Sequence, residues 1–168
     1  MMKNLVVVRG TMGAGKTAVC QKLLPLSAPA VWLDGDWCWQ MAPFDPNEEN
    51  RRMVMDNVSC LLRSFLQNSG LETVIFCWVL HQDEILQQLI ERLKPLEYRL
   101  LVYNLILSPQ ALEARLTEDV RRGLRQPDIL ARSLARLPLY RRLAGTPVDV
   151  SEITPEQAAK RIRELTQE

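Results

Sequence analysis

The eight residues from Gly10 to Thr17, GTMGAGKT, constrain the fold of this chain more than any other part of its sequence. They match the pattern G-x-x-x-x-G-K-[ST] and lie between an apolar run at residues 5–8 and a helix-favouring segment that starts at residue 15. Glycines let the backbone approach a ligand closely, and the N–H groups of such a loop point at anionic oxygens. The motif predicts a polyphosphate site made by Gly10, Thr11, Met12, Gly13, Ala14, Gly15, Lys16 and Thr17.

Two side chains of this motif have predicted roles of their own. Lys16 supplies a positive charge to the phosphates, and we expect it to face solvent without packing in the core. The Thr17 hydroxyl is predicted to ligate Mg²⁺.

Short apolar runs alternate with longer amphipathic segments along the rest of the chain. Strands are predicted at residues 5–8, 30–33, 73–79, 100–107 and 148–150. Helices are predicted at 15–24, where Pro25 ends the helix, and at 83–93, and Ser108 and Thr154 are each followed by proline as cap and first helical residue. Another helix is predicted to begin with Asp45 as its cap and Pro46 as its first residue, and to end at Gly70.

Continuous apolar strands separated by helices indicate an α/β fold in which helices cover both faces of a parallel sheet. The length of 168 residues fits a single domain, 1–168. In such a sheet, ligands bind at the carboxyl ends of the strands, where the phosphate-loop motif lies.

Composition and charge exclude several classes of partner. The net charge of +1 gives no overall electrostatic case for nucleic acid or acidic lipid. Four cysteines without CxxC spacing fit a reducing compartment, and the chain has neither a secretory signal pattern nor an apolar run of about 18 residues. We therefore expect a cytoplasmic protein, monomeric or homodimeric, that binds no nucleic acid and no membrane.

Two carboxylates follow the second predicted strand, in the sequence Leu33-Asp34-Gly35-Asp36. At the carboxyl end of the sheet, Asp34 and Asp36 are expected to lie near a bound polyphosphate, where one of the two acids could hold Mg²⁺ through water. The other could accept the proton of an acceptor hydroxyl. The alternative is an Asp-Gly turn with a helix cap.

The phosphate loop, the Asp-x-Asp pair and an arginine-bearing segment in the last third resemble the small P-loop kinases, particularly the gluconate and shikimate kinases and the chloramphenicol phosphotransferase type. The resemblance implies a three-layer αβα P-loop NTPase fold with a five-stranded sheet in the order 2-3-1-4-5, a mobile lid, and ATP as phosphoryl donor. It also implies that Asp34 assists the metal and that Asp36 contacts the acceptor hydroxyl. Gluconate kinases usually follow these acids with an aromatic residue, another residue and His-Pro, whereas this chain has Trp37-Cys38-Trp39-Gln40, which disfavours gluconate.

The arginine-bearing segment is the predicted lid, at about residues 118–128. Residues 115–142 contain eight arginines against three acids, and the stretch from Arg121 to Pro127 has the composition of a hinged loop. We expect Arg121 and Arg122 to bind the nucleotide, and Arg125, the nearest match to the arginine that precedes a proline in shikimate-kinase-like lids, to act on the transferring phosphate. The alternative, a solvated helix surface, is favoured for the arginines beyond residue 130.

The acceptor side of the site gives weaker signals. Trp37 and Trp39 could form a wall of the acceptor pocket or pack in the core. Arg51 and Arg52 could bind an acidic group or face water, and His81 could serve a structural or a catalytic role.

Two absences narrow the function class. No Asn-Lys-x-Asp motif of GTPases is present, and residues 75–80, at the end of the third strand, contain no acid of the kind that oligomeric ATPases use. The sequence therefore predicts an enzyme that moves the γ-phosphate of ATP to a hydroxyl of a small molecule, with Lys16, Asp34, Asp36 and Arg125 as catalytic residues and with Thr17 and Asp34 at Mg²⁺. A nucleoside or nucleotide kinase and a non-catalytic ATP-binding regulator are the alternatives.

Overall fold

A central parallel sheet organises the computed structural model, which describes residues 2–168. Its strands are β1 (Lys3–Arg9), β2 (Ala30–Asp34), β3 (Thr73–Trp78), β4 (Tyr98–Ile106) and β5 (Thr146–Asp149). All neighbouring strands run parallel, in the order β2-β3-β1-β4-β5. This is the sheet of a three-layer αβα P-loop NTPase fold, and the predicted strand order is confirmed.

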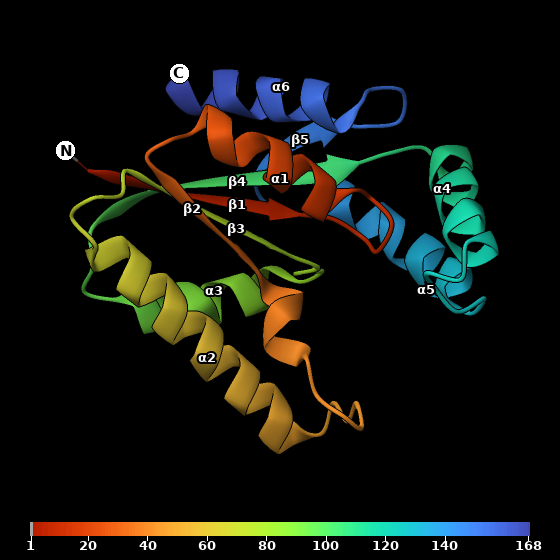
Figure 1. Cartoon of the computed structure of the whole chain (residues 1–168), viewed down its shortest axis with the longest axis horizontal. Helices are drawn as coiled ribbons and strands as arrows, with labels where there is room; N and C mark the ends of the chain where they lie inside the picture. The colour runs from red at the N-terminus through yellow and green to blue at the C-terminus, as the bar shows by residue number, and fades with distance from the viewer. Residues whose placement is uncertain (1) are drawn as a thin grey trace.

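Helices cover both faces of the sheet (Figure 1). The helices are α1 (Lys16–Leu26), α2 (Glu48–Gln67), α3 (Asp83–Leu93), α4 (Pro109–Arg121), α5 (Ile129–Arg136) and α6 (Pro155–Gln167), with two 3₁₀ helices, η1 (Gly35–Trp39) and η2 (Leu137–Arg141). The helices α1 and α6 lie on one face, α2 and α3 lie on the other, and α4 and α5 lie beyond the carboxyl ends of the strands. The last pair therefore stands next to the place where ligands bind in such sheets.

Both faces of β1 are buried, which explains its continuous apolar run. Val6 and Val8 pack in the core cluster under α1 and α6, whereas Leu5 and Val7 pack in the cluster under α2 and α3. Each of these four side chains is at most 1% exposed. Since alternate residues serve opposite cores, residues 5–8 leave no position for a polar side chain, and the polar residues of β1 lie at its two ends.

Two helix caps agree with the sequence and one does not. Ser108 and Thr154 cap α4 and α6 as predicted, and Thr154 forms a full capping box with Gln157. The predicted Asp45 cap is wrong, because α2 begins at Glu48 and its cap is Asn47, whose side chain accepts a hydrogen bond from the Asn50 amide at 2.8 Å. The Asp45 carboxylate accepts instead from the Asn47 side chain.

The structure also corrects the ends of several elements. Pro25 lies inside the last turn of α1, and the helix ends one residue later, at Leu26. The proline has no N–H to donate to the Gln21 carbonyl, so the helix loses one hydrogen bond in its last turn. The last strand starts at Thr146, earlier than predicted, and includes Pro147. Proline is tolerated there because β5 is an edge strand, with one neighbour only.

Within residues 2–168, no helix is both long enough and apolar enough to cross a membrane.

Candidate active site

The phosphate loop connects β1 to α1, the context that its motif requires. Gly13 and Gly15 have φ angles of 85° and 95°, in the left-handed region that favours glycine. A Cβ on Gly13 would also lie 2.5 Å from the Leu116 side chain, so α4 packs closely against the loop. On its other side, the Thr11 hydroxyl donates to the Ser133 carbonyl of α5 at 3.0 Å. The loop is thus held by the two helices that carry the predicted lid.

Lys16 is buried, which corrects the expectation of a solvent-facing side chain. Its Nζ donates to the carbonyls of Gly10 at 2.9 Å and Thr11 at 3.1 Å, so the ammonium lies inside the loop that it serves. Burial lowers the pKa of Lys16, and the nearby carboxylates of Asp36 and Asp34 oppose that shift. The positive charge is therefore held at the centre of the loop, next to both predicted acids.

Asp34 connects the phosphate loop to the end of β2. The Thr17 hydroxyl donates to Asp34 Oδ2 at 2.7 Å, and the backbone amide of Asp36 donates to Asp34 Oδ1 at 3.0 Å. The carboxylate is almost fully buried. Both of its oxygens are engaged, and this fixes its orientation toward the start of α1.

The Thr17 and Asp34 pair fits a Mg²⁺ ion by the chemistry of its oxygens. Mg²⁺ takes hard oxygen ligands and keeps several waters, so it is held by one or two protein groups together with substrate phosphates. Among residues 2–168, no group of three or more His, Cys, Asp or Glu side chains is placed to hold a metal. A hydroxyl and a carboxylate at the phosphate loop are what a Mg²⁺ and nucleotide site needs.

Asp36 faces the cavity beside the loop, two residues beyond Asp34. Burial in the site and the neighbouring Asp34 carboxylate raise the pKa of Asp36, while Lys16, the Trp78 indole and Arg125 lower it by smaller amounts. These groups therefore share one electrostatic environment, although they are far apart in the sequence, between residue 16 and residue 125.

Gly35, between the two acids, allows Trp78 to approach them. A Cβ at Gly35 would lie 2.5 Å from the Trp78 ring, so any larger residue would displace the indole at the end of β3. The sequence analysis assigned no role to Trp78. The glycine between the two acids could have indicated that another side chain packs closely over this turn.

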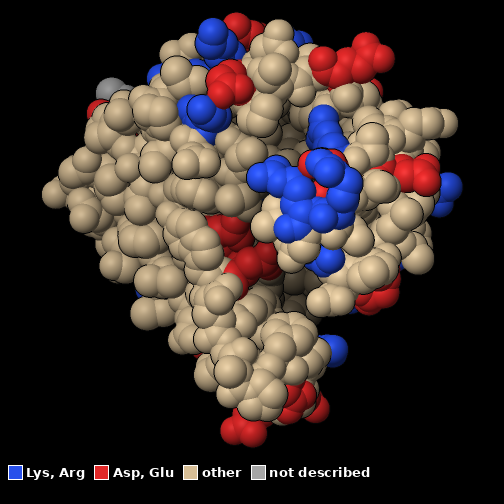
Figure 2. Space-filling model, turned by 45° about the vertical axis from the view of Figure 1, so that its right-hand side comes forward, with Lys and Arg blue, Asp and Glu red and all other residues tan. Residues whose placement is uncertain are grey.

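The predicted lid divides into residues that reach the site and residues that do not. Gly123, at φ 71°, ends α4 in a Schellman motif, with Gly123 N–H bonded to the Val120 carbonyl and Leu124 N–H to the Asp119 carbonyl, both at 2.9 Å. Arg125 then returns toward the site, where Asp119 pairs with it at 3.0 Å and where its charge acts on Lys16 and Asp36. Figure 2 shows basic side chains gathered over α4 and α5, beside a hollow in which acidic side chains are visible.

Arg121 and Arg122 lie on the outer side of this segment. Arg121 donates to both carboxylate oxygens of Glu118 at 2.8 Å, three residues earlier on α4, and Arg122 is the exposed cap of that helix. The structure does not bring either guanidinium to the phosphate loop. Their predicted contact with a nucleotide would require the Glu118 pair to break or the segment to move.

Arg115 is a site residue to which the sequence analysis assigned no role. Its guanidinium donates to the carbonyl of Ala14, in the phosphate loop, at 3.2 Å and also to the carbonyl of Val150 after β5. It borders a cavity of about 190 Å³ that is lined by Ala14, Gly15, Val19, Arg115, Val150, Ile153, Thr154, Pro155 and Ala158. Its place between Leu112 and Leu116, both fully buried, was a signal that this arginine faces inward.

Arg9 ties the beginning of the phosphate loop to the opposite side of the sheet. It is completely buried at the end of β1, pairs with Asp83 at 2.8 Å, and donates through Nε to Asn104 Oδ1 at 2.6 Å. Asp83 is the first residue of α3. The buried guanidinium thus fixes the loop relative to the helix that borders the next cavity.

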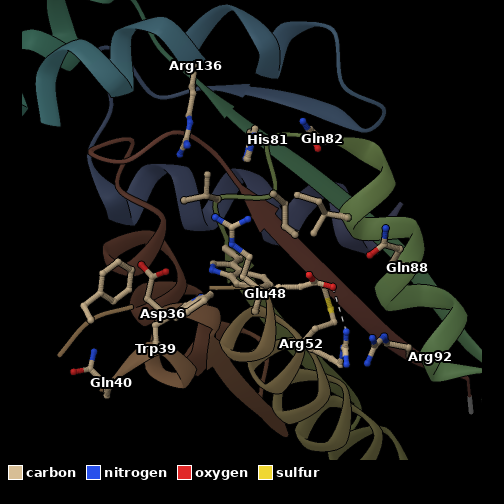
Figure 3. A pocket seen from close by; sticks show the side chains of 17 residues that line it. Asp36, Trp39, Gln40, Glu48, Arg52, His81, Gln82, Gln88, Arg92 and Arg136 are labelled. Carbon is tan, nitrogen blue, oxygen red and sulfur yellow. Dashed lines mark hydrogen bonds and ion pairs between the residues drawn. The ribbon is translucent and has the colours of Figure 1, made fainter. Parts of the chain in front are cut away.

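A larger cavity of about 1,010 Å³ opens beside Asp36 (Figure 3). The walls come from η1 and the loop after it, from α2, from the end of β3, from α3 and from α5. The lining residues are Asp36, Trp39, Gln40, Phe44, Glu48, Arg51, Arg52, Met55, Trp78, Val79, Leu80, His81, Gln82, Ile85, Gln88, Arg92 and Arg136.

The cavity brings together several residues whose roles the sequence left open. Trp39, Arg51, Arg52 and His81 all line it. Trp37 does not, because its ring packs on Trp32 at a centroid distance of 4.9 Å. Burial and the charge of Arg136 lower the pKa of His81, which favours its neutral form.

Comparison with known proteins places the chain among P-loop proteins. Residues 6–129 match the model of the family described as the AAA domain. No curated protein sequence matches the chain.

Solved structures resemble the chain over nearly its whole length. A gluconokinase from Sinorhizobium meliloti 1021 has 18% identity and a TM-score of 0.69, with 98% of this chain and 94% of that one covered. The tunicamycin resistance protein of Deinococcus radiodurans has 16% identity and a TM-score of 0.67, with 98% and 95% covered. A shikimate kinase from Acinetobacter baumannii, in complex with shikimate, has 21% identity and a TM-score of 0.64, with 99% and 94% covered. At these identities the likeness shows that the fold is shared.

Proposed function

This chain belongs to the AAA domain family, and from that premise we propose that it is a P-loop kinase that transfers the γ-phosphate of ATP to a hydroxyl of a small molecule. The observation that carries the proposal is the position of Asp36. This carboxylate lines the large cavity and also lies in the electrostatic environment of Lys16, at the centre of the phosphate loop. A group in that position can hold an acceptor hydroxyl beside a transferring phosphate.

Each residue of the site has a role in this proposal. The loop amides and Lys16 bind the phosphates, and Thr17 and Asp34 would hold Mg²⁺. When bound, the ion supplies positive charge to the phosphate oxygens. Asp36 orients the acceptor hydroxyl and takes its proton as the oxygen bonds to the γ-phosphorus, while the bond from that phosphorus to the bridging oxygen breaks and ADP leaves. Arg125 adds positive charge from the segment between α4 and α5.

We place the nucleotide base in the smaller cavity, against Arg115. That cavity adjoins Ala14 and Gly15 of the phosphate loop, and most of its other walls are apolar side chains from α1, from the loop after β5 and from the start of α6. A planar guanidinium beside an apolar slot suits an aromatic base, because it stacks on π faces.

We expect Arg115→Met to raise the KM for ATP about tenfold while changing kcat much less. The base contact is made equally in the ground state and the transition state, so its loss weakens binding only. Steady-state kinetics with varied ATP would measure this. Arg161→Met is the matched control, since Arg161 is an exposed residue of α6 that pairs with Glu164. A fall in kcat with no change in the KM for ATP would contradict the placement of the base.

Arg125→Gln is expected to lower kcat by roughly ten- to a thousandfold, with a smaller effect on ATP affinity. A charge that acts on the transferring phosphate contributes most in the transition state. The ion pair with Asp119 keeps Arg125 near the site. Because exposed ion pairs are weak, this pair contributes little to the free energy of folding. Arg132→Gln, which removes an exposed α5 arginine paired with Asp128, is the control. Equal turnover in wild type and Arg125→Gln would show that Arg125 belongs to the solvated surface and has no role in transfer.

The direct test of the function is transfer of labelled γ-phosphate from ATP to a panel of acceptors. The panel should contain sugars, sugar acids, nucleosides, nucleoside monophosphates and aromatic alcohols. The proposal predicts a phosphorylated product with at least one alcohol. A protein that binds MgATP but phosphorylates none of these compounds would instead be a non-catalytic ATP-binding regulator.

A further inference from the structure

An aromatic wall surrounds the carboxylate of Asp36. Asp36 and Trp39 are three residues apart in η1, and residues with this spacing eclipse in a 3₁₀ helix, so both side chains point to the same side. Trp39 packs against Phe44 at a centroid distance of 5.6 Å, and the Trp78 ring covers Gly35 from the end of β3. An acceptor hydroxyl at Asp36 therefore belongs to a group that rests on ring faces.

The wall is unsuited to a polyol. A hydroxyl pressed against a ring face loses its hydrogen bonds to water and gains none, which costs free energy for every such group. Phe44 is 64% exposed, so most of this apolar ring faces solvent when no ligand is bound. A flat apolar group bound beside Asp36 would bury this ring and pair with its face.

Unpaired positive charge borders the rest of the cavity. Four arginines line it against two acids, Asp36 and Glu48. Arg52 pairs with Glu48 at 3.3 Å, and Arg92 pairs with Asp56.

The other two arginines, Arg51 on α2 and Arg136 on α5, lack such a partner. Across residues 2–168, no carboxylate lies within ion-pair distance of either guanidinium. In Figure 3, Arg136 extends from α5 into the cavity, whereas Asp36 and Trp39 enter it from η1, on another wall. A ligand that meets both Asp36 and Arg136 must therefore reach from one wall of the cavity to the other.

We propose that the acceptor is an aromatic acid alcohol, in which the reacting hydroxyl lies next to an aromatic ring and an anionic group lies farther along the molecule. The hydroxyl meets Asp36, the ring lies against Trp39, Phe44 and Trp78, and the anion meets Arg51 and Arg136. The volume of about 1,010 Å³ lies at the upper end of the range for small-molecule sites, so it admits a ligand of this length. This assignment rests on the proposed kinase function.

A set of matched probes tests each part of the proposal by calorimetric titration in the presence of Mg²⁺ and a non-hydrolysable ATP analogue, so that binding is measured without phosphoryl transfer. The reference probe is 4-(hydroxymethyl)benzoate. The saturated analogue 4-(hydroxymethyl)cyclohexanecarboxylate keeps the charge without the aromatic ring, and 4-methylbenzyl alcohol keeps the ring without the charge. The cationic 4-(aminomethyl)benzyl alcohol reverses the charge. We expect the reference probe to bind about tenfold more tightly than the saturated or neutral analogue, and the cation to bind weakest.

Two variants assign these preferences to residues. Trp39→Leu should remove the preference for the aromatic ring over the saturated ring, whereas Trp37→Leu, in the same short helix but outside the cavity, should keep it. Arg136→Gln should remove the preference for the acid over the neutral alcohol. Arg132→Gln, on the same helix and paired with Asp128, should keep that preference.

The outcomes separate this inference from the kinase proposal. Tighter binding of the saturated or neutral analogue, or no binding of the reference probe at millimolar concentration, overturns the inference. If gluconate or another polyol is phosphorylated faster than every aromatic acid, the kinase proposal stands and the aromatic assignment is wrong. If MgATP itself does not bind, the kinase proposal fails, and the inference that rests on it fails too.

Discussion

Replacing Lys16 by alanine is expected to abolish phosphoryl transfer and to weaken MgATP binding by about ten- to a hundredfold, the scale of a lost charge-assisted hydrogen bond. The ammonium of Lys16 is held inside the phosphate loop by the carbonyls of Gly10 and Thr11. A bound phosphate would accept hydrogen bonds from the ammonium at the same place. Calorimetric titration with MgATP and a transfer assay would measure both effects.

Because Lys16 is buried, its removal also affects stability. The two carbonyls lose their donor, at a cost of roughly 1–3 kcal/mol, which a protein of ordinary stability tolerates. Lys16→Met keeps the apolar stem in place and separates the loss of charge from the loss of packing. Lys22→Ala, on the outer side of α1 and paired with Glu156, is the control that should bind MgATP normally. Unchanged ATP affinity in both Lys16 variants would overturn the assignment of the donor site.

Asp36→Asn is expected to retain MgATP binding and to lose phosphoryl transfer by about a hundredfold or more, the usual scale for a positioned acid or base. The amide keeps the shape of the carboxylate, but it is a poor proton acceptor. Since Asp36 lies outside the proposed nucleotide-binding residues, the affinity for MgATP should hardly change. Transfer of labelled γ-phosphate by wild type and variant gives the comparison, and equal rates would remove Asp36 from the catalytic residues.

The pH dependence of transfer gives a second readout for Asp36. Burial and the Asp34 carboxylate raise the pKa of Asp36, so its carboxyl stays protonated to a higher pH than an isolated aspartate. A protonated carboxyl cannot accept a proton, so the rate should fall as the pH drops through this raised pKa. Asp36→Asn should remove that acidic limb. Asp34→Asn should instead change the Mg²⁺ concentration that transfer requires, because Asp34 is the predicted metal ligand.

Local patterns in the sequence predicted the elements that depend on few residues. The phosphate loop could be recognised because its glycines, Lys16 and Thr17 lie in one short stretch of sequence. The caps Ser108 and Thr154 could be recognised because each is followed by a proline. The strand order is not a local property, and it came from the resemblance to small kinases. The structure confirms that order.

The missed features depend on contacts between distant residues or on choices between similar neighbours. Asp45 and Asn47 can both cap a helix, and only the path of the chain selects Asn47. Arg115 and Trp78 acquire their roles by meeting Ala14 and Gly35 from other elements.

The sequence also did not show which of the two tryptophans, Trp37 or Trp39, lines the cavity, and the reason is different. Trp39 faces the cavity and Trp37 does not because η1 is a 3₁₀ helix, an element too short to leave a periodic pattern in the sequence.

The two halves of the candidate site are encoded very differently along the chain. The phosphate-binding part of the donor half is one uninterrupted run of eight residues, whereas the walls of the large cavity are drawn from η1 and α2, from the end of β3 with α3, and from α5. Substitutions in those segments can accumulate without altering the phosphate loop, since they share few of its contacts. On the proposed function, the architecture permits a change of acceptor by drift or by segment exchange while ATP remains the phosphoryl donor, and a library confined to residues 39–55 would be a small starting point for finding variants that phosphorylate other alcohols.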